Sequence, residues 1–119
     1  MVWKSNFKKG KELILATSTK KGQPNANIVM SLGFIDKKSN SILIANCQMN
    51  KTFKNLLENN SLCVVSGYYR IKGNVKIYYS GKYFNKCLEN NKDAKYLPKC
   101  AIIINVKEVF NLDKVKVVF

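Results

Sequence analysis

The sequence predicts a mainly β domain in which short antiparallel strands carry two inserted helices. Three observations predict this class. Six or seven short apolar stretches follow one another, turns of hairpin length separate most of them, and only two segments place apolar residues at helical spacing. A sheet of this kind removes its exposed edges by closing into a barrel. With 119 residues, 46% of them hydrophobic, the chain is expected to form a single domain over residues 1–119.

The first half of the chain provides three predicted strands and one helix. Residues 1–11 are polar and are expected to form a turn or a short helix. Apolar, partly β-branched stretches between turn residues predict strands over residues 12–19, 25–36 and 41–46. Phe53, Leu56 and Leu57 then share one helical face, which predicts a helix over residues 50–59. Asn50 is its expected N-cap, and Asn59-Asn60 is expected to take a left-handed conformation at its end.

The second half repeats this mixture of strands and a helix. Strands are expected over residues 62–65, 68–79, 101–107 and 115–119. The segment 81–91 returns to helical spacing, with Tyr83, Phe84, Cys87 and Leu88 on one face and Ser80 as a candidate cap. Residues 90–99 form a polar loop.

The charge of the chain is unusual and excludes several chemistries. Lys and Arg number 21 against seven Asp and Glu, a net charge of +14, and histidine is absent. The absence of histidine therefore excludes catalytic mechanisms and metal sites that need an imidazole. Arg70 is the single arginine, which argues against base readout in DNA, and the lysines are scattered like a solvated surface. The acidic residues never cluster, so a carboxylate pair or a hard-metal site has no candidate.

The four cysteines and the apolar runs indicate a cellular location. The cysteines are Cys47, Cys63, Cys87 and Cys100. No two of them form a C-x-x-C pair and all sit beside apolar residues, so buried free thiols are expected. No segment has the pattern of a signal peptide, and no apolar run approaches the roughly 20 residues of a membrane span. We therefore expect a cytoplasmic protein without membrane attachment.

One segment has the composition of an anion site. Cys47-Gln48-Met49-Asn50-Lys51-Thr52 joins an apolar strand to the start of a helix. The first turn of a helix offers unpaired N–H groups, Lys51 adds a positive charge and Thr52 a hydroxyl donor, so the segment can hold a phosphate monoester. The alternative is a simple helix start in which Asn50 caps the helix and Lys51 points into water.

The order and spacing of several motifs resemble one protein family. They are residues 13–18 (LILATS), 22–25 (GQPN), 42–45 (ILIA), 50–56 (NKTFKNL) and 71–73 (IKG). Together they look like the pyridoxamine 5'-phosphate oxidase-like FMN-binding split barrels, especially the short single-domain flavoproteins. The resemblance implies a six-stranded antiparallel Greek-key split β-barrel. It also implies a homodimer with FMN at the subunit interface.

The resemblance also implies where FMN would be held. Lys51 and Thr52 match the pair that binds the phosphate. The stretch Asn27, Ile28, Val29 and Met30 matches the strand along the flavin, and Cys47, Gln48 and Met49 would border the ring. The partner subunit would add Tyr96 or Leu97. Cys47 itself is expected to pack there rather than to act as a redox thiol.

These expectations define a main function and two alternatives. The main one is an FMN-dependent oxidoreductase in which the flavin carries hydride or electrons. Pyridoxal phosphate synthesis is not expected, because members that form it end in a motif with Arg and His, whereas this sequence ends in Val115-Lys116-Val117-Val118-Phe119. The alternatives are a non-enzymatic split barrel with another anionic ligand and, less favoured, a basic nucleic-acid-binding barrel. Deazaflavin and haem remain open as cofactors.

Overall fold

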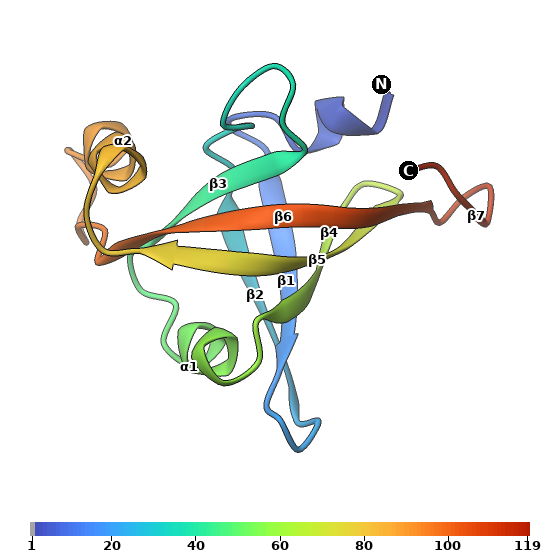
Figure 1. The fold of residues 1–119 in the computed structure, drawn as a ribbon, viewed down its shortest axis with the longest axis horizontal. Helices are drawn as coiled ribbons and strands as arrows, with labels where there is room; N and C mark the ends of the chain where they lie inside the picture. Colours follow the sequence, from blue (N-terminus) through green and yellow to red (C-terminus); the bar gives the residue numbers. More distant parts are fainter. Residues whose placement is uncertain (1) are drawn as a thin grey trace.

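The computed structural model describes residues 2–119 and consists mainly of one antiparallel sheet (Figure 1). The strands follow the order β2-β1-β4-β5-β6-β3, and β7 pairs with β6. Their bounds are Glu12–Ser18 (β1), Pro24–Met30 (β2), Ser41–Asn46 (β3), Ser61–Ser66 (β4), Tyr69–Tyr78 (β5), Cys100–Asn111 (β6) and Lys116–Val117 (β7). The helices are a 3-10 turn at Val2–Asn6, α1 at Lys51–Glu58 and α2 at Lys82–Asn90. The predicted fold class is confirmed.

The sheet curves like a barrel but stays open between its two end strands. β2 pairs with β1 alone among the strands, and β3 pairs with β6. The chain after β2 does reach β3, since the N–H of Leu32 donates to the carbonyl of Leu43 at 2.9 Å and Phe34 forms a bridge with Ile42. The predicted second strand is therefore shorter than expected and ends at Met30 instead of Asp36. The opening lies beside β2.

The main core fills the inner side of the sheet. Leu13 and Leu15 of β1 are fully buried, whereas Ile14 between them points outward. The N-terminal turn covers one end of this core with Trp3, whose ring lies 5.6 Å from that of Phe119. The two termini consequently lie at the same end of the molecule (Figure 1).

β3 and the first half of β6 are buried on both faces. Ile42, Ile44, Ile102 and Ile104 belong to the main core, whereas Leu43, Ala101 and Ile103 point the other way into a second apolar cluster. That cluster is closed by α2, which contributes the fully buried Cys87. Continuous apolar runs are expected where a strand is covered on both sides.

The predicted helix caps are wrong in detail. Asn50 occupies the N-cap position of α1, but its side chain makes no capping hydrogen bond and its φ is 49°. Gly81 rather than Ser80 precedes α2, and Asn59 is extended rather than left-handed. The first turn of α1 therefore has no side-chain cap.

The four cysteines are free thiols, as expected. Cys87 and Cys100 are buried, and Cys47 and Cys63 are half-buried. Burial raises the pKa of Cys87 to about 12 and also raises the pKa of Cys47 and of Cys100. No helix within residues 2–119 has the length and apolar character that a membrane crossing requires.

Two neighbouring leucines of α1 test this packing. Leu56 is 2% exposed and Leu57 is 59% exposed. Leu56→Ala removes a core side chain and should lower the free energy of unfolding by about 2–5 kcal/mol. Leu57→Ala should change it by less than about 0.5 kcal/mol, as measured by urea denaturation. Equal losses in the two variants would contradict the packing of α1.

The thiols should differ in their reaction with iodoacetamide. At pH 8 a group with a pKa of about 12 is a thiolate in only about one molecule in ten thousand, and only the thiolate reacts. The buried Cys87 should therefore stay unmodified in the folded protein while Cys63 is labelled. Mass spectrometry of the peptides measures this, and labelling in urea, where all four thiols should react, is the control. Rapid labelling of Cys87 in the folded protein would refute its burial.

Candidate functional site

A hollow of about 300 Å³ occupies the opening between the two end strands. It is bounded by the edge of β2, the end of β3 with the turn that follows it, and the end of α2. Seven of the nine residues predicted for the cofactor site line it: Asn27, Ile28, Val29, Met30, Cys47, Gln48 and Met49. These residues lie up to 22 positions apart in the sequence, and the fold brings them together.

β2 supplies one wall of the hollow. Because β2 pairs only with β1, the backbone groups on its other edge face no neighbouring strand. One of them, the N–H of Ile28, donates to the side-chain oxygen of Asn27 at 2.8 Å. Val29 packs against the main core, whereas Ile28 and Met30 are 61% and 57% exposed. The wall thus combines unpaired backbone groups with exposed apolar side chains.

A buried side chain, that of Asn46, stabilises the turn after β3. Asn46 is buried, and its side-chain oxygen accepts a hydrogen bond from the N–H of Met49 at 3.1 Å. Asn50 then adopts a positive φ, a conformation that asparagine tolerates better than most residues. This geometry starts α1 at Lys51, directly after the residues that border the hollow.

Lys51 and Thr52 fall outside the lining of the hollow. Lys51 is exposed at the start of α1 and has no ion-pair partner within residues 2–119. Thr52 is fully buried, and its hydroxyl oxygen accepts a hydrogen bond from the side-chain amide of Asn25 at 3.0 Å. This bond ties the start of α1 to the start of β2. Thr52 thus fixes the position of the helix, and the exposed Lys51 supplies a positive charge that no ion pair neutralises within residues 2–119.

Asn90 and Asn91 also line the hollow and were missed by the sequence analysis. They reach it because α2 packs on β3, where the thiol of Cys87 lies 3.7 Å from the carbonyl oxygen of Ile44. The side-chain amide of Asn91 donates to the carbonyl of Cys87 at 2.8 Å, and its oxygen lies 4.0 Å from the sulfur of Cys47. No local sequence signal links a loop at residue 91 to a strand end at residue 47.

The hollow offers few groups for acid–base chemistry. Its one titratable lining residue is Cys47, and burial raises the pKa of that thiol, so it stays protonated near neutral pH. Among residues 2–119, no cluster of three or more His, Cys, Asp or Glu side chains could hold a metal ion. Tyr96 and Leu97 are exposed in the loop before β6 and do not line this hollow. The described lining of this hollow therefore offers no side chain that exchanges a proton near neutral pH.

Comparison with known proteins agrees with this fold. The family model described as pyridoxamine 5'-phosphate oxidase matches residues 4–115. An uncharacterized protein of Methanocaldococcus jannaschii is 33% identical over 107 residues, which cover 84% of this chain and 72% of the relative.

Solved structures show the same arrangement of strands. HupZ from Group A Streptococcus superposes with a TM-score of 0.79 at 24% identity, over 91% of this chain and 90% of HupZ. An FMN-binding protein from Syntrophomonas wolfei gives a TM-score of 0.66 at 14% identity, over 89% of this chain and 78% of that protein. Because the family model spans most of the chain, the protein belongs to the pyridoxamine 5'-phosphate oxidase family.

Proposed function

We propose that this chain binds FMN in the hollow beside β2 and acts as an oxidoreductase through it. The observation that carries the proposal is the meeting of the open edge of β2 with the uncapped start of α1. A flavin mononucleotide has a flat polar-edged ring at one end and a phosphate at the other. The open edge of β2 suits the ring, and the uncapped start of α1 suits the phosphate. The family and its FMN-binding structural neighbours add support.

The phosphate end would lie at α1. Asn50 leaves the first N–H groups of the helix without a side-chain cap, and an uncapped helix start attracts anions. Lys51, exposed and without an ion pair in the described chain, can turn toward such a group. Thr52 contributes by holding α1 against Asn25 of β2.

The ring would lie along Asn27–Met30. The free edge of β2 offers backbone donors and acceptors, and Ile28, Met30 and Met49 offer apolar surface. The flavin supplies the redox chemistry when bound. The chain orients it, and the thiol of Cys47 stays neutral beside it. The single arginine, Arg70, does not line the hollow, and its guanidinium carbon lies 4.8 Å from the ring centre of Phe110.

We also propose that two copies of the chain pack together over the outer face of β1 and β2. Ile14 lies opposite Ile28 in the strand register and opposite Val65 of β4. Ile14, Ile28 and Met30 are 45%, 61% and 57% exposed. Neighbouring exposed apolar side chains of this size are typical of an interface. The patch is continuous with the lining of the hollow, so a second copy would cover the open side of the FMN site.

Lys51→Gln tests the phosphate anchor. Loss of a charged hydrogen bond to phosphate costs about 1.5–3 kcal/mol, so the Kd for FMN should rise about tenfold or more. Titration of flavin fluorescence measures this. Lys54→Gln, a change of the exposed lysine three positions further along α1, should leave the Kd within about twofold and is the matched control. A wild-type chain that is colourless and whose Tm does not respond to excess FMN would disprove the proposal.

Ile14→Glu tests the proposed dimer. A carboxylate in the middle of the patch should be costly to bury, so the variant should sediment as a monomer while the wild type sediments as a dimer. Leu57→Glu places the same charge on exposed α1 and should remain dimeric. Because the second copy would complete the site, Ile14→Glu should also weaken FMN binding. A monomeric wild-type chain with full FMN affinity would refute the shared site.

A further inference from the structure

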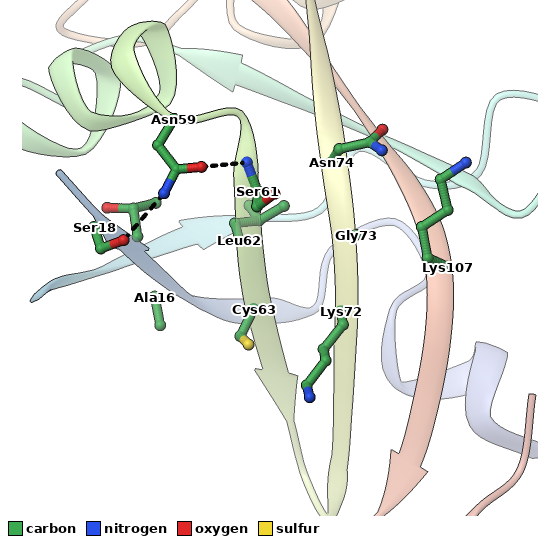
Figure 2. A pocket seen from close by; sticks show the side chains of 11 residues that line it. Ala16, Ser18, Asn59, Ser61, Leu62, Cys63, Lys72, Gly73, Asn74 and Lys107 are labelled. Carbon is green, nitrogen blue, oxygen red and sulfur yellow. Dashed lines mark hydrogen bonds between the residues drawn. The ribbon is translucent and has the colours of Figure 1, made fainter. Parts of the chain in front are cut away.

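The hollow beside β2 is lined by uncharged side chains. Although 24% of the residues of the chain are charged, none of the described residues that line this hollow is. The larger cavity on the outer face of β1, β4 and β5 differs, because Lys72 and Lys107 line it from opposite sides of β5 (Figure 2). A ring in the hollow is therefore oriented by hydrogen bonds to neutral groups, and the donors and acceptors among these groups decide which ring fits.

The end of α2 contributes two neighbouring asparagines to this lining. Asn90 is the last residue of the helix and Asn91 is its C-cap, and both are half-buried. The buried Cys87, one turn earlier, packs α2 into the apolar cluster that Leu43 and Ile103 form on the sheet. The two asparagines therefore stand on an element whose position is set by core packing, as a precise binding site requires.

The helix holds the side-chain amides of both asparagines in one orientation. The NH₂ group of Asn90 donates to the carbonyl of Lys86 at 2.8 Å, and that of Asn91 donates to the carbonyl of Cys87 at 2.8 Å. An asparagine amide carries its donors on the nitrogen and its acceptor lone pairs on the oxygen. Because the nitrogen is bound to the helix, the oxygen on the other branch of the amide is left for a ligand. The end of α2 thus adds hydrogen-bond acceptors to the hollow.

The two side-chain oxygens differ in what they already contact. The oxygen of Asn91 lies 4.0 Å from the sulfur of Cys47, whose neutral thiol can donate to it. The oxygen of Asn90 accepts no hydrogen bond within residues 2–119. A half-buried acceptor without a donor gains most from a ligand that supplies an N–H group. Asn90 is therefore the acceptor that a ligand can use, and Asn91 joins the end of α2 to the turn after β3.

The oxidised flavin ring has one group that matches this acceptor. Its only N–H is at N3, and this group lies between the carbonyls at C2 and C4. On the β2 wall, Asn27 uses its side-chain oxygen to accept from the N–H of Ile28, and its NH₂ group makes no hydrogen bond in the described part of the chain. Asn27 can therefore donate to a ring carbonyl, while Asn90 accepts from N3–H. The lining complements the acceptor–donor–acceptor edge of the ring.

We propose that the side-chain oxygen of Asn90 binds the N3–H group of the flavin and makes the hollow selective for rings that carry this N–H. The proposal rests on the FMN site proposed above and assigns one residue of α2 to the recognition of its ring. Asn91 positions Asn90 by tying the end of α2 to Cys47. A site that hydrogen-bonds one group of its ligand rejects an analogue that lacks this group, because its own polar atom is then left unpaired.

The test compares FMN with 3-methyl-FMN, in which a methyl group replaces the hydrogen on N3. Fluorescence titration of the full chain gives the Kd of each flavin, and the wild type should bind FMN about fivefold or more tightly. Asn90→Ala removes the acceptor and leaves room for the methyl group. Its Kd for FMN should rise about fivefold, and its preference should fall to within about twofold. Asn85→Ala, at an exposed position of α2 outside the lining, should keep both values and is the matched control.

Asn90→Leu separates the hydrogen bond from simple contact, because leucine keeps the bulk and lacks the acceptor. It should weaken FMN binding as Asn90→Ala does, and wild-type affinity in this variant would overturn the hydrogen bond. Equal binding of the two flavins by the wild type, or an unchanged preference in Asn90→Ala, would overturn the role of Asn90 and leave the proposed function standing. A wild type that binds neither flavin would refute the proposed function and, with it, this assignment.

Discussion

The pairing of β3 with β6, with apolar side chains on both faces, is the constraint on which the other elements depend. On one face Ile44 and Ile102 complete the barrel interior, and on the other Leu43 and Ile103 receive α2. Water is therefore excluded from both sides of one ladder. The ends of β3 and α2 are fixed by this packing, and both border the hollow beside β2. The position of the candidate site thus follows from a core interaction that lies next to it.

The same constraint explains why the barrel remains open. β3 is held by β6 and by α2, and β2 is held by β1 alone. The chain between them pairs with β3 only after Met30, through Leu32 and Phe34. The remaining length of β2 keeps an unpaired edge, and the turn of Asn46 with Met49 places α1 next to it. A strand edge and a helix start, both with unused hydrogen-bonding capacity, meet at one place.

Much of this architecture could be predicted from local patterns, and the failures have physical causes. Strand positions follow from apolar alternation and turn residues, and the face of α1 follows from the spacing of Phe53 and Leu56. The lack of a capping hydrogen bond from Asn50 and the contact of Asn91 with the hollow depend on tertiary packing, which a local pattern does not contain. The grouping of Asn27–Met30 with Cys47–Met49 came from resemblance. The register between β5 and β6 shifts at Lys72/Gly73 and leaves Lys107 without a partner, and the only sign of this in the sequence is two adjacent polar residues, Lys107 and Glu108.

The free edge of β2 has a consequence for the folding and storage of the protein. An unpaired strand edge is a template on which another chain can add a strand, and such edges promote aggregation unless they are guarded. β2 contains few residues that hinder pairing with another strand. Pro24, which has no N–H to donate, stands at its start, and the lysines of the preceding turn lie outside the strand. A molecule seated along Asn27–Met30 would shield that edge. If the proposed ligand binds there, its occupancy of the hollow would therefore also lower the tendency of the chain to aggregate through this edge.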